Sequence, residues 1–103
     1  MQQFHRLKRS LGSLFGEIIR AHREAKGWSQ MKLAAEANLH LTALGSIERG
    51  RRNPSLLTVY LIANALEIPP EVIIAEVSAK KPNLKDSNGY LDAPKHKPGR
   101  PKK

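Results

Sequence analysis

The sequence predicts an all-α fold of five short helices within residues 13–79. Apolar residues recur there at intervals of three and four, the spacing of one helix face. Strong stop signals divide the segment at Gly27, Asn38, Gly50 and the pair Pro69–Pro70. Since the 103 residues include no cysteine, apolar packing rather than disulfides must hold the fold together.

The first two helices follow from caps and stops. Ser13 is the expected cap of the first helix, and Gly27 its left-handed terminator. Ser29 caps a second helix over about residues 30–37, which ends at Asn38, a residue that tolerates the left-handed conformation of a tight turn. The residues that recur at helical spacing in the first helix are Phe15, Ile18, Ile19, His22 and Ala25, with His22 a polar residue on an otherwise apolar face.

Three more helices complete the prediction. The third runs over residues 41–49, after a turn of about three residues, and Gly50 ends it. Asn53–Pro54–Ser55 starts the fourth, and Pro69–Pro70–Glu71 opens the fifth. The buried stripe of the fourth helix is Leu56, Val59, Ile62, Ala63 and Leu66.

The positive charge lies at the two ends of the chain. The net charge is +9, yet residues 10–79 hold seven residues of each sign, while residues 80–103 hold eight basic residues against two acidic ones. We therefore expect a basic arm over residues 1–12, a helical domain over 13–79 and a disordered basic tail over 80–103. Flexible cations around a neutral domain favour a polyanion such as DNA, although tails of this kind can also serve solubility alone.

The helical segment closely resembles the helix-turn-helix domain of Cro and lambda-type phage repressors. Gly-Trp-Ser-Gln at residues 27–30 and Ile-Glu-Arg-Gly-Arg-Arg-Asn-Pro-Ser at residues 47–55 carry the resemblance, which covers about residues 13–75. Ala34 supplies the small residue that two steeply crossing helices need at closest approach. The resemblance implies a five-helix bundle whose third helix enters the DNA major groove.

The resemblance also assigns residues to DNA. Residues on the outward face of the third helix are expected to contact base edges: Leu41, Thr42, Gly45 and Ser46. Residues at the start of the second helix and around the third are expected to contact phosphates: Gln30, His40, Arg49, Arg51, Arg52 and Asn53. Each has a structural alternative, because Leu41 can pack against the turn, Thr42 can cap the helix, and the loop arginines can be solvated.

Two further features qualify this assignment. Arg23 and Glu48 match family positions that pair with each other, so they are assigned to a structural ion pair. The third helix lacks the Gln, Asn or Arg that make bidentate base contacts, so its specificity is expected to be modest or to depend on DNA shape. His40 is a poor helix cap, which leaves its ring available for a phosphate.

A second apolar face on the fourth helix predicts a homodimer. Its residues, together with apolar residues of the fifth helix, form the expected interface: Leu57, Tyr60, Leu61, Ile73, Ile74 and Val77. A two-fold axis would place two recognition helices about 34 Å apart on half-sites. The alternative is that the fifth helix covers this face within one chain.

The sequence therefore predicts a cytoplasmic, sequence-specific regulator of transcription that binds a palindromic operator in double-stranded DNA as a homodimer. Two alternatives remain open: an antitoxin that regulates its own promoter and binds a toxin, and a protein-binding adaptor. The four histidines are dispersed without metal-ligand spacing, and no nucleophile stands beside a base, so we expect no metal, cofactor or catalysis. Apolar runs are too short for a membrane helix.

Overall fold

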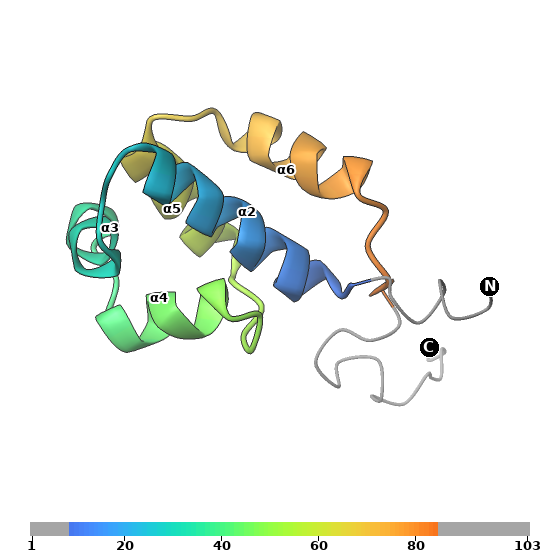
Figure 1. Cartoon of the computed structure of the whole chain (residues 1–103), viewed down its shortest axis with the longest axis horizontal. Helices are drawn as coiled ribbons and strands as arrows, with labels where there is room; N and C mark the ends of the chain where they lie inside the picture. Colours follow the sequence, from blue (N-terminus) through green and yellow to red (C-terminus); the bar gives the residue numbers. More distant parts are fainter. Residues whose placement is uncertain (1–8, 85–103) are drawn as a thin grey trace, which may run out of the picture.

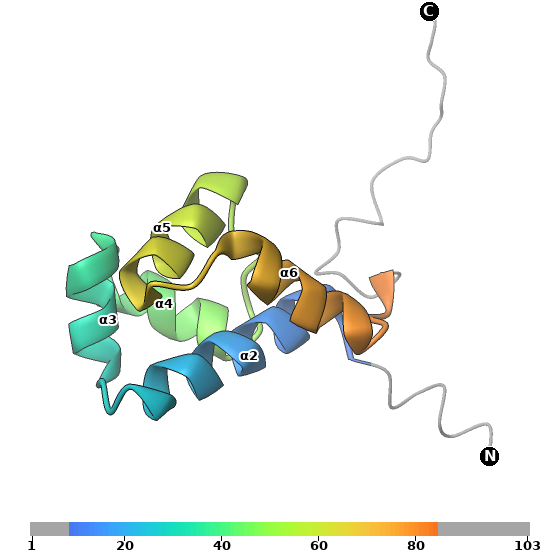
Figure 2. The same cartoon turned by 90° about the horizontal axis from the view of Figure 1, so that it is seen from above.

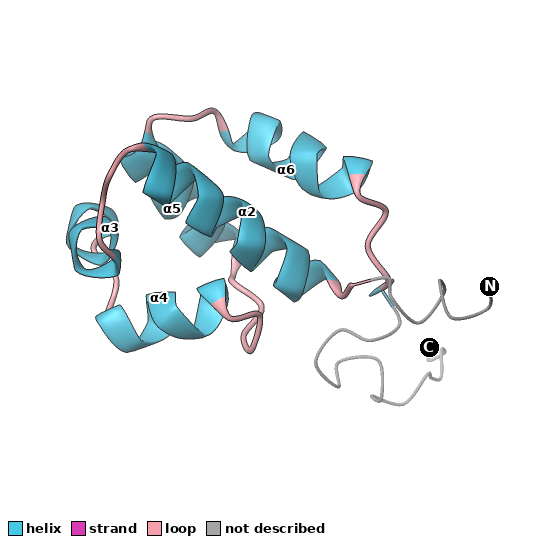
Figure 3. Ribbon diagram, viewed as in Figure 1, coloured by secondary structure: helices cyan, strands magenta, loops and turns pink. Residues whose placement is uncertain are grey.

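The computed structural model describes residues 9–84, which form a bundle of five α-helices (Figure 1). The predicted all-α, five-helix fold is thus confirmed, and Figure 3 shows helices joined by loops among the coloured residues. The helices are α2 (Leu11–Ala25), α3 (Gln30–Ala37), α4 (Leu41–Glu48), α5 (Leu56–Leu66) and α6 (Pro70–Ala79).

Local sequence explains most helix ends. The Ser29 hydroxyl accepts a hydrogen bond from the Lys32 amide at 3.0 Å, and the Ser55 hydroxyl accepts one from the Thr58 amide at 3.1 Å. Asn38 ends α3 in the left-handed conformation, at φ 59°. These three positions behave as the capping preferences of serine and asparagine predict.

The start of the first helix was predicted wrongly. The cap is Ser10 rather than Ser13, and α2 begins at Leu11. The Ser10 hydroxyl accepts a hydrogen bond from the Ser13 amide, at 3.2 Å. Ser13 lies inside the helix, and its hydroxyl accepts hydrogen bonds from the Arg9 guanidinium, the shorter at 2.7 Å.

Helix α2 runs through the middle of the bundle. In Figure 1, α4 lies on one side of α2 and α6 on the other, with α5 behind; Figure 2 shows α3 across the end of the bundle. The six largest fully buried side chains come from all five helices and join them into one core: Ile19, Leu33, Leu44, Ile47, Ile62 and Ile73. Helix α4 is therefore held on a rigid base formed by α2 and α3.

Two glycines let α4 and the loop after it approach α2. A Cβ atom at Gly16 would lie only 2.7 Å from the Glu48 carbonyl oxygen, and one at Gly12 would lie 2.7 Å from the side-chain oxygen of Asn53. No side chain larger than hydrogen fits at Gly16, because backbone opposes it there. The backbone of residues 47–53 consequently lies directly on the amino-terminal half of α2.

The carboxyl end of the described chain returns to its start. The Asn83 amide donates a hydrogen bond to the Arg9 carbonyl at 2.8 Å, and Ser10 and Asn83 form an isolated parallel β-bridge. Residues 82–84, which were expected to be part of a disordered tail, are therefore placed against the start of α2. Residues 1–8 and 85–103, the remainder of the predicted arm and tail, lie outside the described residues.

No single helix in residues 9–84 is long and apolar enough to cross a membrane. Helices α5 and α6 reach that length and composition only when taken as a pair, and the chain bends by 108° between them.

Candidate nucleic-acid interface

Helices α3 and α4 form the predicted helix-turn-helix. The turn at residues 38–40 joins them, and the Leu39 amide donates a hydrogen bond to the Ala34 carbonyl at 2.9 Å. Ala34 is 3% exposed, so the small side chain lies inside the pair as expected. Leu33, Leu44 and Ile47 lock the two helices from within, since all three are buried.

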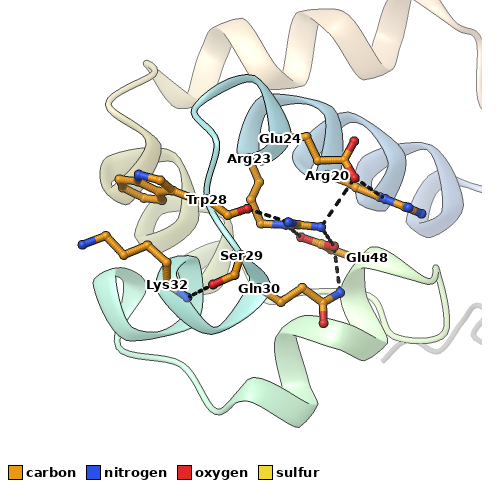
Figure 4. A network of polar contacts seen from close by, with 8 residues as sticks. All are labelled: Arg20, Arg23, Glu24, Trp28, Ser29, Gln30, Lys32 and Glu48. Atoms are coloured by element: carbon orange, nitrogen blue, oxygen red, sulfur yellow. Dashed lines mark hydrogen bonds and ion pairs between the residues drawn. The ribbon is translucent and has the colours of Figure 1, made fainter.

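A buried polar network links α2, α3 and α4 (Figure 4). Arg23 donates from Nε to Glu48 at 2.8 Å and from Nη2 at 3.0 Å, which is the pair expected from the resemblance. Its Nη1 donates to the Trp28 carbonyl at 2.7 Å. The hydrogen bond to Glu48 raises the pKa of Arg23 against the opposing effect of burial, so this charge persists at every pH of interest.

Gln30 belongs to this network as well as to the start of α3. Its Nε2 atom donates a hydrogen bond to Glu48 Oε1 at 2.9 Å. The predicted phosphate contact from the Gln30 side-chain amide therefore competes with a structural bond. In the first turn of α3 the Lys32 backbone amide donates to the Ser29 hydroxyl, whereas the amides of Gln30 and Met31 have no partner within the helix and are suited to an anion.

The outward face of α4 presents the residues expected to read bases. Leu41 is 43% exposed, Thr42 is exposed, and Ser46 is half-buried. Gly45 is instead buried, because Arg49 and Gln30 lie over it: a Cβ atom at Gly45 would be 3.1 Å from Arg49 Nη1 and 3.7 Å from Gln30 Oε1. Gly45 thus makes room for Arg49 on the face of α4.

Exposed basic side chains lie directly after the carboxyl end of α4. Arg49, Arg51 and Arg52 are all exposed, and none forms an ion pair within the described part of the chain. His40 is also exposed, and its ring makes no capping hydrogen bond to α4. Three guanidinium groups at one end of a helix, without ion-pair partners in the described residues, form a surface suited to phosphates.

Asn53 differs from the other expected phosphate ligands in that part of its side chain is buried. Its side-chain oxygen is buried against Gly12 and has no hydrogen-bond partner. The residue is turned toward α2 rather than aligned with the loop arginines, because the backbone of the loop lies against that helix. A phosphate would accept a hydrogen bond from the side-chain nitrogen of Asn53 rather than from this oxygen, so the assignment of Asn53 as a phosphate ligand stays a prediction.

The expected dimer interface is only partly exposed. Ile73 and Val77 are 0% and 3% exposed, because they fill the core between α6 and its own chain, so including them was wrong. Leu61 is half-buried against the core. Leu57, Tyr60 and Ile74 remain at the surface, at 67%, 55% and 47% exposure, and we call these three the α5–α6 surface.

Sequence reasoning missed the glycine contacts on α2 and the role of Gln30. The spacing of Gly12 and Gly16, one helical turn apart, was the available signal for a close helix contact. It also missed that His22 Nε2 lies 2.7 Å from Glu76 Oε1, which links α2 to α6. Within residues 9–84 no group of three or more acidic or histidine side chains lies close enough to hold a metal ion.

The exposed face of α4, its support on α3 and the cations at its end define a helix-turn-helix DNA-binding domain. A family model described as helix-turn-helix matches residues 19–73, more than half of the chain. The chain belongs to the Cro/C1-type helix-turn-helix family of DNA-binding regulators, as its sequence suggested.

Sequence similarity to known proteins supports this family membership. The chain is 38% identical over 73 residues to the immunity repressor of Bacillus phage phi105, a match that covers 71% of this chain and 51% of the repressor. It is 44% identical over 62 residues to the control protein C.BamHI of Bacillus amyloliquefaciens, covering 59% of this chain and 76% of that protein. The chain thus spans about half of the phage repressor and about three quarters of the control protein.

Similarity to solved structures supports the same family membership. The restriction-modification controller C.AhdI of Aeromonas hydrophila superposes with a TM-score of 0.59 at 40% identity, covering 60% of this chain and 94% of the controller. The controller C.Esp1396I, solved as a tetramer with its natural 35 base-pair operator, superposes with a TM-score of 0.63 at 31% identity. That match covers 68% of this chain and 92% of the controller chain.

Proposed function

We propose that this chain is a transcriptional regulator of the repressor or controller type that binds a palindromic operator as a homodimer in the cytoplasm. The observation that carries the proposal is that the exposed side chains of α4 and of the loop after it form no ion pair within the described residues. Thr42 lies exposed there, and Arg49, Arg51 and Arg52 follow it without partners in the described residues. The similarity to a controller solved as a tetramer in complex with its operator supports DNA binding.

The proposed contacts to DNA are of two kinds, those to base edges and those to phosphates. Thr42 and Ser46 carry hydroxyl groups that donate to or accept from base edges, and Leu41 suits a thymine methyl group. Arg49, Arg51, Arg52 and the first turn of α3 hold phosphates, which set the register of α4 in the major groove. His40 adds a phosphate contact through its exposed ring.

The homodimer follows from the α5–α6 surface. Two residues of this surface, Tyr60 and Ile74, line a common groove between the two helices together with Leu56. All three are exposed, so the prediction that Leu56 is buried was wrong. Large apolar side chains gathered on one face mark an interaction site, and a self-complementary patch produces two-fold symmetry. A symmetric pair would present two α4 helices to successive major grooves.

The test is selection of bound fragments from genomic DNA by the full-length protein, compared with the Thr42→Ala/Ser46→Ala variant. We expect the native chain to enrich a palindromic motif and the variant to lose or alter its preference. Arg51→Gln/Arg52→Gln should instead weaken binding to all sequences alike, because phosphates carry no sequence information. Enrichment of the same motif by both the native chain and the Thr42→Ala/Ser46→Ala variant would contradict the assignment of α4 as the reader.

A further inference from the structure

The guanidinium group of Arg49 lies over the outward face of α4 rather than beyond the end of the helix. Arg49 is the carboxyl-terminal cap of α4, yet a Cβ atom at Gly45, four residues earlier, would lie 3.1 Å from its Nη1 atom and 3.8 Å from its Cζ atom. The Arg49 side chain therefore extends back by about one helical turn, toward the amino end of α4. Its guanidinium group shares the face that carries Thr42 and Ser46, the proposed contacts to base edges.

The absence of a side chain at Gly45 leaves room for this arrangement. A separation of 3.1 Å is shorter than an ordinary van der Waals contact, so a methyl group at Gly45 would displace the guanidinium group of Arg49. Glycine inside a helix lowers the stability of that helix relative to alanine. The space that Arg49 occupies gives a physical reason for glycine at this position.

The positive charge of Arg49 is available to a ligand. The carboxylate next to it in sequence, Glu48, already accepts hydrogen bonds from Arg23 at both oxygens and from Gln30 at one of them. Arg49 is exposed and forms no ion pair within the described part of the chain. The Gln30 Oε1 atom, 3.7 Å from the same Cβ position at Gly45, is a neutral acceptor and leaves this charge uncompensated.

We propose that Arg49 reads a guanine in each half-site, by donating two hydrogen bonds from its guanidinium group to the O6 and N7 atoms in the major groove. The planar, forked donors of arginine match these two acceptors. The proposal rests on the proposed function, because it needs α4 to lie in the major groove. It goes further by moving Arg49 from the phosphate contacts to the base contacts. It also supplies the bidentate reader that α4 itself, Leu41–Glu48, does not contain.

The first test compares two variants that remove the same charge from the full-length protein. Fragment selection gives the motif of the native protein, and competition binding then measures the affinity for that operator and for operators with each base pair replaced in turn. Arg49→Gln should lower the discrimination at one G·C pair of each half-site by about 5- to 150-fold and leave the discrimination at other positions unchanged. Arg51→Gln, the matched control, should weaken binding to all of these duplexes alike. Uniform weakening by Arg49→Gln as well would indicate a phosphate contact and overturn the proposal.

The second test uses Gly45→Ala, which keeps the arginine but fills the space under its guanidinium group. Discrimination at the same G·C pair should fall, whereas the urea unfolding midpoint should not, because alanine favours the helix. In a double variant with Arg49→Gln, the Gly45→Ala change should lower this discrimination no further, since both changes act on one contact. Full discrimination in Gly45→Ala, or additive losses in the double variant, would overturn the proposal.

The proposed function and this inference fail in different ways. If α4 does not enter the major groove, the native protein selects no motif at all. If α4 reads bases without Arg49, the native protein selects a motif that Arg49→Gln preserves and that Thr42→Ala/Ser46→Ala alters.

Discussion

Arg23 and Glu48 show how much one buried pair contributes to the position of α4. Their side chains are 10% and 2% exposed, and Glu48 also accepts the hydrogen bond from Gln30. We expect Glu48→Ala to lower the free energy of unfolding by about 3–5 kcal/mol, because it strands a buried guanidinium. Arg23→Met/Glu48→Leu should cost less than this single change. Urea unfolding measures both, and a larger loss in the double variant would contradict the interpretation.

His40 leaves the start of α4 without a side-chain cap. Its φ and ψ, −67° and 142°, are those of a cap, but its ring makes no capping hydrogen bond. His40→Ser should therefore raise the free energy of unfolding by about 0.5–2 kcal/mol. The companion variant Ser29→Ala should lower it by a similar amount, since Ser29 caps α3. An unchanged urea midpoint for His40→Ser would show that the missing side-chain cap does not lower the free energy of unfolding.

At the scale of elements, the contact of α4 with α2 depends on Gly16. An added Cβ atom would meet the Glu48 carbonyl at 2.7 Å and the Ile47 carbonyl as well, so α4 must shift. Gly16→Ala should cost about 3 kcal/mol of stability or more. Gly27→Ala is the matched control, because it faces open space at φ +75° and should cost only about 1 kcal/mol. Urea unfolding compares the two, and equal losses would show that α4 yields to the added methyl group.

At the scale of the whole molecule, the proposed homodimer depends on the α5–α6 surface. Leu57→Glu or Tyr60→Glu should convert the dimer to a monomer with unchanged helix content, because a charge would be buried at the interface. Met31→Glu is the control, since Met31 is equally exposed on α3 but outside this surface. Sedimentation velocity at one fixed concentration, together with circular dichroism, provides the measurement. A native chain that sediments as a monomer would remove the dimer from the proposal.

Short-range signals in the sequence determined the helices and the family. Serine caps, the left-handed Asn38 and apolar periodicity depend on neighbours within a few residues, so α3 through α6 were predicted closely. The tertiary structure alone decided which apolar residues stay exposed: Ile73 and Ile74 are adjacent in sequence, yet one is in the core and the other at the surface.

Long-range contacts explain the remaining differences. The cap of α2 is Ser10, Arg9 donates a hydrogen bond to Ser13, and the Asn83 amide bonds to the Arg9 carbonyl at the start of that helix. The inward turn of Asn53 depends on Gly12, about forty residues earlier in the chain. Such partners are distant in sequence, and only the packing of the complete bundle brings them together, because periodicity records which face is apolar but not what lies against it.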